Sequence, residues 1–240
     1  MGQFPLPSSI WAPQTKRQGL AEGYAVIGLG RFGVAVCEEL VRWGAEVLAL
    51  DDNERAIDDL RQLEPSIEAR LVDCTDEEAM REAGVLQVDT VVVAIAGSIE
   101  ASITATLIAK DAPGSRVKQV IARATSDIHM KMLQRVGADR VVYPLKMQGQ
   151  RLGEELVRPN LLERLELDAE HSIEEILVPS TFAGQSLRQL NLRRNHHVTV
   201  LAAEPQHSFT VNPPGSQVLQ EGERLVVMGS KESLAALPQE

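Results

Sequence analysis

Short apolar runs alternate with amphipathic stretches along the chain from Tyr24 onward. Apolar runs of about four to eight residues between turn signals are typical of buried strands, and apolar positions that recur every three or four residues are typical of helices. The pattern predicts strands at 24–29, 46–51, 68–73, 89–96, 118–124 and 140–144. It predicts helices between them at 33–44, 54–64, 75–84, 98–112 and 126–138. Because strands separated by helices pair in parallel through right-handed crossovers, we expect an α/β fold with a doubly wound parallel sheet.

The pattern changes after Leu145. Residues 146–167 are polar and amphipathic, which predicts a helical connector broken near Pro159. Turn-rich spacers then separate three β-like runs, which predict a small C-terminal α+β lobe. The predicted division is a flexible tail at 1–22, a Rossmann-like domain at 23–145, a crossover helix at 146–167 and a C-terminal domain at 168–240.

The N-terminal residues have no helical or strand period, so we interpret 1–22 as a mobile tail. A docking strap built around Phe4, Leu6, Ile10 and Trp11 is the alternative interpretation.

A glycine-rich loop follows the first predicted strand and opens the first predicted helix. Its sequence, Gly28-Leu29-Gly30-Arg31-Phe32-Gly33, matches G-x-G-x-x-G. In that context the first glycine allows a tight turn, the second lets the backbone approach a phosphate, and the third lets the helix pack close to the strand. The helix N-terminus then presents free N–H groups to an anion, so the loop predicts a nucleotide site.

An acid closes the second predicted strand. Asp51 lies 18 residues after Gly33, near the expected spacing of about 20 residues. Its carboxylate is suited to accept hydrogen bonds from ribose hydroxyls and to repel a 2′-phosphate, which favours NAD or a plain adenine nucleotide over NADP.

Further candidates lie where parallel strands end, since ligands of this fold bind at the carboxyl ends of its strands. Arg31 is suited to pair with outer phosphates, and Arg123 is a charge inside an apolar strand that needs a partner. Asp73 has two open interpretations, a contact to the nucleotide or a helix cap. The remaining candidates at these ends are Cys74, Thr75, Ala94, Ile95 and Ser98.

Composition and charge exclude several classes. The 240 residues carry a net charge of −10, which argues against a nucleic-acid partner. The two cysteines, Cys37 and Cys74, suggest neither a disulfide framework nor a zinc site, and a reducing intracellular compartment fits them. No apolar run approaches the roughly 18 residues of a membrane span. We expect His129 on a helix surface and the pair His196-His197 in a surface turn, so no catalytic constellation is predicted.

Several stretches together resemble one family. "YAVIGLGRFGVAVCEEL", "EVLALDDNE", "DTVVVAIAGSIEAS", "VIARATSDIHMKMLQRVGADRVVYP" and "LRQLNLRRNHHVTVLA" are similar to the RCK, or KTN, regulatory subunits of bacterial Ktr and Trk potassium transporters, the TrkA family with its KtrA-like members. The resemblance covers roughly residues 24–235, and the joint presence of "GLGRFG" and "GADRVVYP" is more specific than the glycine pattern alone.

The resemblance implies a Rossmann lobe, a crossover helix and a small C-terminal lobe. It implies dimers that form an octameric ring on the cytoplasmic side of a membrane-embedded potassium transporter subunit. It implies sensing of ATP and ADP without turnover, with NAD(H) as an alternative. The nucleotide residues that it implies here are Gly28, Leu29, Gly30, Arg31, Phe32, Gly33, Asp51, Asp52, Asp73, Cys74, Thr75, Ala94, Ile95, Ser98, Glu100 and Arg123.

Two further features follow from the resemblance. The family's C-terminal lobe can bind cyclic di-AMP, and the matching residues here are Leu190, Asn191, Leu192, Arg193, Val198 and Val200. A solvated basic turn is the alternative for this stretch. Many relatives carry a glutamate that helps to hold a divalent cation where this chain has Leu145, so the resemblance leaves a cation here in doubt.

Three functions stay open at this point. The first is a nucleotide-gated regulatory subunit that is not an enzyme. The second is an NAD-dependent oxidoreductase with a small second domain, and the third is a nucleotide-binding oligomerisation module of another cation transporter. A regulator binds its nucleotide and leaves it unchanged, so turnover separates the first from the second.

Overall fold

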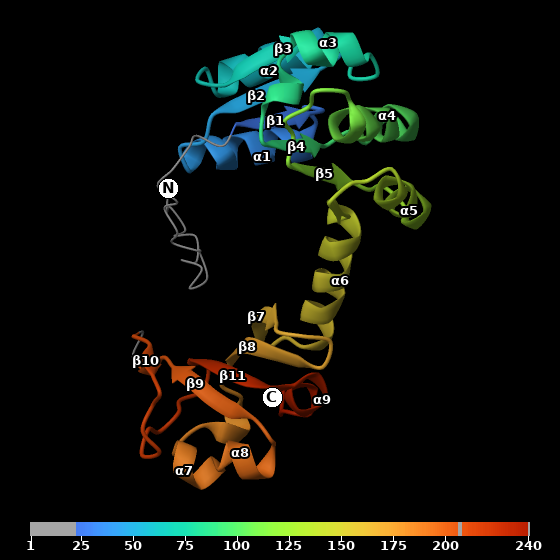
Figure 1. The fold of residues 1–240 in the computed structure, drawn as a ribbon. Helices are drawn as coiled ribbons and strands as arrows, with labels where there is room; N and C mark the ends of the chain where they lie inside the picture. The colour runs from blue at the N-terminus through green and yellow to red at the C-terminus, as the bar shows by residue number, and fades with distance from the viewer. Residues whose placement is uncertain (1–22, 206–207, 240) are drawn as a thin grey trace. The chain divides into compact units, whose positions relative to one another are not determined.

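The computed structural model describes residues 23–205 and 208–239, so the tail predicted at 1–22 lies outside the described residues. The chain divides into two compact units, one ending at Pro144 and one beginning at Leu145 (Figure 1). None of the helices in these described ranges is long and apolar enough to cross a membrane.

The first unit is a six-stranded parallel sheet with strand order β3-β2-β1-β4-β5-β6, so the predicted doubly wound sheet is confirmed. Figure 1 shows β1 in the middle of the sheet, between β2 and β4. The strands are β1 (Tyr24–Ile27), β2 (Val47–Asp51), β3 (Glu68–Leu71), β4 (Thr90–Val93), β5 (Gln119–Arg123) and β6 (Arg140–Val142). The connections are α1 (Arg31–Arg42), α2 (Glu54–Leu63), α3 (Glu77–Glu82), η1 (Val85–Gln87), α4 (Ile99–Asp111) and α5 (Asp127–Arg135).

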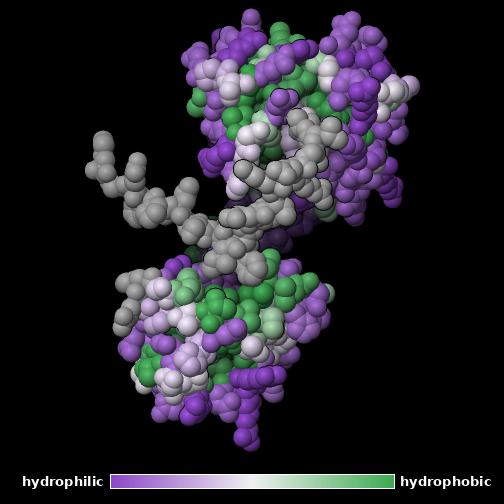
Figure 2. All heavy atoms as spheres, turned by 60° about the vertical axis from the view of Figure 1, so that its left-hand side comes forward, coloured by the Kyte–Doolittle hydropathy of each residue, from purple (hydrophilic) through white to green (hydrophobic). Residues whose placement is uncertain are grey.

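The sheet is buried on both faces. On one face Val26 of β1 packs in a cluster with Cys37 of α1 and Ile57 of α2. On the other face Ile27 packs with residues of α3, α4 and α5, including Leu133. Residues of the central strands therefore have no solvent face, which is why they read as continuous apolar runs rather than as alternating ones. The helices turn their polar sides outward, and Figure 2 shows hydrophilic residues over much of the visible surface of this unit.

The second unit is built on a five-stranded antiparallel sheet with strand order β10-β9-β11-β8-β7. Helix α6 (Pro144–Val157) leads into it from the end of the first unit. The strands are β7 (Leu161–Glu166), β8 (His171–Leu177), β9 (Thr199–Ala203), β10 (Thr210–Val211) and β11 (Arg224–Ser230). The short helices are η2 (Ser180–Phe182), α7 (Leu187–Leu190), α8 (Leu192–Asn195) and α9 (Lys231–Ala235).

The expectation of a helical connector over 146–167 is wrong for the residues after Val157. The helix ends at Val157, two residues before Pro159, and Leu161–Glu166 form β7, which pairs with β8. Proline disfavours helical backbone in the residue before it, so the chain leaves the helix there. The backbone groups of the next segment find partners in β8, and Leu161 joins the core of the second unit.

A buried ion cluster joins the end of α6 to β7 and β8. The Glu174 side chain on β8 is fully buried and lies 2.7 Å from the guanidinium groups of both Arg158 and Arg164. Burial alone raises a carboxyl pKa, but the two guanidinium groups outweigh it and hold the pKa of Glu174 below its ordinary value. A buried carboxylate is tolerated because each oxygen has a charged partner.

Candidate functional site

The glycine loop joins β1 to α1, and close backbone contacts require two of its glycines. Gly28 has a φ of +96°, and a Cβ there would lie 2.9 Å from the backbone nitrogen of Ile95. A Cβ on Gly33 would lie 1.9 Å from the carbonyl oxygen of Gly28. A side chain at either position would force the strand, the helix and the end of β4 apart.

The second glycine has a different role. A Cβ on Gly30 would meet nothing within 4 Å among the described residues, so Gly30 faces open space at the start of α1. Helices α2 to α5 each begin with a side-chain cap, but no side chain of the described chain caps α1. The four caps are Asn53, Asp76, Ser98 and Ser126. The first N–H groups of α1 are therefore left for an external acceptor, in the arrangement that binds phosphate.

Asp51 ties the loop to the end of β2. Its Oδ2 accepts the backbone N–H of Leu29 at 2.6 Å, and its Oδ1 accepts that of Asn53 at 2.9 Å. A carboxylate offers about four lone-pair directions, so Asp51 retains acceptor capacity for ribose hydroxyls beyond these two bonds. It therefore fits the predicted role and also fixes the loop.

Negative charge gathers at the carboxyl ends of β2 and β3. Burial raises the pKa of Cys74 to about 11, and the negative charges of Asp73, Asp52 and Asp51 contribute to the rise. Those three carboxylates thus lie close enough to the Cys74 thiol to act on it. The same carboxylates would repel a 2′-phosphate on the ribose of a bound nucleotide, which fits a nucleotide without one.

Asp73 organises its own turn. Its Oδ1 accepts the backbone N–H of Thr75 at 2.9 Å and the Thr75 hydroxyl at 2.6 Å, and these two bonds lower the pKa of Asp73. Asp76 caps α3 by accepting from the N–H groups of Glu78 and Ala79, so the helix-cap interpretation of Asp73 is wrong.

The end of β4 contributes backbone more than side chains. The N–H of Ala94 donates to the carbonyl oxygen of Ile27 at 2.7 Å, which brings the β4 end against the loop. Ser98 accepts the N–H of Ala101 as the cap of α4. Glu100 is exposed in the first turn of that helix.

Arg123 at the end of β5 is the most telling side chain of the site. Its guanidinium carbon lies 5.5 Å from the centre of the Phe32 ring, so it stands beside the start of α1. Its Nε is buried and has no hydrogen-bond partner among the described residues. Buried donors of charged groups are normally paired, so this arginine fits a position where an anion completes its bonds. Arg31, at the first position of α1, is exposed.

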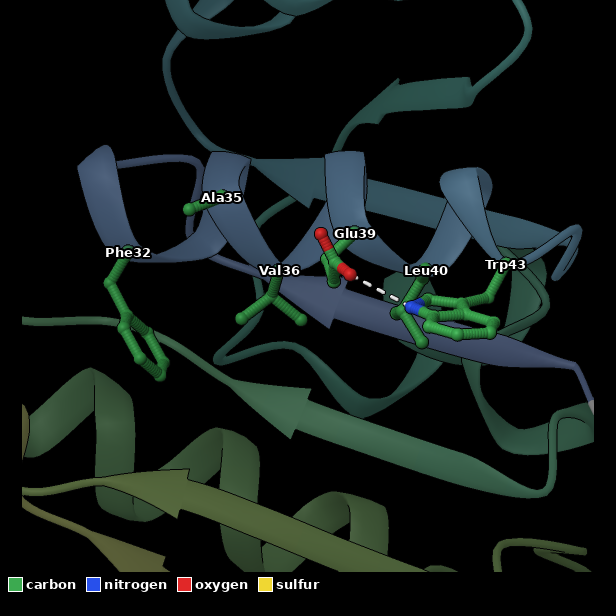
Figure 3. A pocket seen from close by; sticks show the side chains of 6 residues that line it. All are labelled: Phe32, Ala35, Val36, Glu39, Leu40 and Trp43. Atoms are coloured by element: carbon green, nitrogen blue, oxygen red, sulfur yellow. Dashed lines mark hydrogen bonds between the residues drawn. The ribbon is translucent and has the colours of Figure 1, made fainter. Parts of the chain in front are cut away.

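The outer side of α1 carries a separate apolar groove of about 330 Å³. Figure 3 shows its lining side chains on one side of the helix, from Phe32 to Trp43, with the Trp43 indole N–H donating to Glu39 at 2.8 Å. The residues that line it are Phe32, Ala35, Val36, Glu39, Leu40 and Trp43. It offers no phosphate-binding group, and it shares only Phe32 with the glycine loop.

The cyclic di-AMP residues lie in the second unit, and half of their side chains are inaccessible. Leu190, Leu192 and Val198 are in the core of this unit. Asn191, in the left-handed region at φ 44°, and Arg193 are exposed, and Val200 is half-buried. A ligand there would meet backbone groups and arginine rather than the three core side chains, and this site stays a prediction.

His129 is the residue that sequence reasoning placed wrongly. It is 1% exposed rather than on a helix surface, and its Nδ1 lies 3.1 Å from the Thr125 hydroxyl and 3.3 Å from the Thr125 nitrogen. The signal that could have identified it is its place three positions after the Ser126 cap. From there a polar side chain can reach back to the backbone before the helix, as glutamate or glutamine does in a capping box.

The fold and the loop define a Rossmann-type nucleotide-binding class, and comparison with known proteins gives the family. The TrkA-N domain model matches residues 24–144, and the TrkA-C domain model matches residues 173–238. The chain is 35% identical over 207 residues to Ktr system potassium uptake protein C of Bacillus subtilis (strain 168), covering 86% of this chain and 91% of that protein. It is 35% identical over 212 residues to Ktr system potassium uptake protein A of Vibrio alginolyticus, covering 88% and 94%. The chain therefore belongs to the TrkA-domain family of Ktr potassium uptake proteins, and the resemblance found in the sequence is confirmed.

Solved structures agree on the fold. The RCK domain of GsuK matches with a TM-score of 0.54 at 23% identity, over 92% of this chain and 46% of that one. The GsuK channel bound to NAD matches with a TM-score of 0.50 at 22% identity, over 89% and 37%. At these identities the likeness shows an RCK-type fold and nothing further.

Proposed function

We propose that this protein is a nucleotide-sensing regulatory subunit of a potassium uptake system, and that it binds an adenine nucleotide in its first unit without turning it over. The observation that carries the nucleotide part is the uncapped start of α1 above the open space at Gly30. The potassium part rests on the relatives, which are named as potassium uptake proteins.

The proposed ligand is ATP or ADP, with NAD(H) as the alternative. The α1 N-terminus and Arg123 would take phosphates, and Asp51 would take the ribose. A GsuK channel with this type of fold has been solved bound to NAD, which supports a nucleotide ligand but leaves its identity to experiment.

The oxidoreductase alternative has less support. A dehydrogenase of this fold needs an acid or base and a substrate clamp beside the nicotinamide. The relatives are potassium uptake proteins rather than dehydrogenases, which favours a regulator over an enzyme.

The proposed partner is a membrane-embedded potassium transporter subunit, with this chain at the cytoplasmic face and assembled through dimers into a ring of eight. Helix α6 supports self-association, because within the described chain none of its residues is buried. Its exposed apolar side chains are Leu145, Met147, Leu152, Leu156 and Val157. Such a stripe normally packs against another helix.

Calorimetric titration of the full chain with ATP, ADP, NADH and cyclic di-AMP tests the proposal. We expect tightest binding by one of the first three, and recovery of that nucleotide unchanged after prolonged incubation. Conversion of the bound nucleotide would favour the enzyme, and binding of none of them would refute nucleotide sensing. Light scattering that shows a monomer at micromolar concentration would contradict the ring.

A further inference from the structure

The end of β5 is fixed by contacts to β6 and to the residue that follows it, which lie outside the glycine loop. Thr125, two residues after Arg123, has its carbonyl oxygen bound by the Tyr143 hydroxyl at 3.0 Å. The neighbouring N–H of Ala124 donates to the carbonyl oxygen of Val142 at 2.7 Å. The strand that carries Arg123 is therefore held from the β6 side.

His129 holds the same residue from α5. Its Nδ1 faces both the backbone N–H and the hydroxyl of Thr125, and its own backbone N–H donates to the Ser126 cap at 3.1 Å. Because a backbone N–H can only donate, Nδ1 must be the unprotonated nitrogen, so the imidazole is neutral with its proton on Nε2. Burial lowers the pKa of His129, which fits the neutral form.

The His129 side chain also has a polar atom whose burial is unfavourable. The Nε2 of His129 is buried and has no hydrogen-bond partner among the described residues. An unpaired buried donor destabilises a fold, so an apolar side chain of similar shape would suit this place at least as well for packing alone. What a leucine could not supply is the acceptor for Thr125.

We propose that His129 is a positioning residue for the nucleotide site: its neutral imidazole fixes Thr125 and so sets the end of β5 from which Arg123 reaches the start of α1. This inference rests on the proposed function, because Arg123 is its phosphate-facing partner. The effect of His129 on nucleotide affinity passes through Arg123 and not through the general stability of the unit.

The test compares two substitutions that have the same branching. Asparagine keeps an acceptor near the position of Nδ1, whereas leucine has the same shape without one. We expect His129→Leu to raise the Kd for ADP on the order of tenfold, the equivalent of one lost hydrogen bond to an ordered group. We expect His129→Asn to stay within roughly threefold of the wild type. Thermal unfolding of the leucine variant should stay near that of the wild type, because the unpaired Nε2 is removed.

The double-mutant cycle with Arg123→Ala decides how His129 acts. In that background His129→Leu should no longer change the ADP affinity, because the group that it positions is gone. Tyr143→Phe, which removes the other contact to Thr125, gives a second variant and should weaken ADP binding in the same direction.

Two results overturn the inference while leaving the proposed function standing. One is wild-type ADP affinity in a folded His129→Leu variant, and the other is an equal loss in the presence and absence of Arg123. Failure of the wild-type chain to bind ADP, ATP or NADH refutes the proposed function itself, and the inference falls with it.

Discussion

The Leu29 N–H donates to Asp51 Oδ2 over 2.6 Å, so the acid that closes β2 also holds the glycine loop. One carboxylate thus links two parts of the site that the sequence separates by 22 residues. Replacement of Asp51 should change both the shape of the loop and the preference for a ribose without a 2′-phosphate over one that carries it.

Asp51→Asn should shift the preference between dinucleotides. Asparagine keeps one acceptor for the Leu29 N–H but removes the negative charge that disfavours a 2′-phosphate. We expect the affinity ratio of NADH to NADPH to fall by about tenfold, measured by competition with a fluorescent ADP analogue. Asp58→Asn, at an exposed acid on α2, is the control and should leave the ratio unchanged.

Substitution by alanine should strongly destabilise the first unit at Gly33 and hardly change its stability at Gly30. Gly33→Ala places a Cβ 1.9 Å from the Gly28 carbonyl oxygen, so the helix or the turn must move and the first unit loses several kcal/mol of stability. Gly30→Ala meets nothing within 4 Å in the described chain and should unfold at nearly the wild-type temperature. Equal thermal shifts in the two variants would contradict the loop geometry.

Arg31 should separate triphosphate from diphosphate. It is exposed at the first position of α1, where a guanidinium can reach an outer phosphate. We expect Arg31→Ala to weaken ATP by about tenfold and ADP by less than about threefold in calorimetry. Arg42→Ala, in the last turn of the same helix, should change neither affinity. Equal losses of ATP and ADP in Arg31→Ala would mean that the residue attracts anions without distinguishing them.

The buried cluster around Glu174 should dominate the electrostatic stability of the second unit. Arg158→Met leaves a fully buried carboxylate with one of its two cations, and we expect a loss of about 3 kcal/mol in the free energy of unfolding. Arg151→Met removes exposed ion pairs with Glu155 and Glu163 and should cost less than about 1 kcal/mol. Urea denaturation followed by circular dichroism compares them, and similar losses in both would show that burial of Glu174 is not decisive.

His129 should make the first unit sensitive to mild acid. Burial lowers its pKa below the ordinary value of 6.5, so below that value the unfolded chain takes up a proton that the folded chain resists. The contribution of neutral His129 to the free energy of unfolding is thus fully present above pH 6.5. It declines as the pH falls toward the folded-state pKa. Between about pH 7.5 and 5.5 the wild type should lose more unfolding free energy than His129→Asn does, measured by urea denaturation at each pH. Identical acid losses in the wild type and in His129→Asn would contradict the assignment.

The sheet could be predicted because the central strands are buried on both faces and read as unbroken apolar runs. The segment 161–166 could not, since "LLERLE" fits a short helix as well as a strand and only its pairing with β8 decides. His129 was misplaced for a related reason. Hydropathy predicts a buried isoleucine and an exposed histidine, but Ile128 is 59% exposed and the neighbouring His129 is buried.

The glycine turn and the position of Asp51 beside it could be predicted from spacing, because a fixed backbone turn imposes the pattern. The side chains that arrive from other strands could not be placed in the same way. The position of Arg123 beside Phe32 depends on the sheet order that brings β5 next to β4. The cap of α3 could not be assigned from the sequence either, since Asp73 and Asp76 both lie just before the helix and only the backbone geometry selects Asp76.

The glycine loop, in the proposed function, holds a nucleotide as a signal. The most direct test is calorimetric titration of ADP into the full wild-type chain and into Gly30→Asp, with Gly30→Ala as the matched control for the fold. We predict saturable binding to the wild type, recovery of ADP unchanged, and no detectable binding to a folded Gly30→Asp variant, whose carboxylate would occupy the open space at the start of α1. Unaltered ADP affinity in Gly30→Asp would contradict a nucleotide site at this loop.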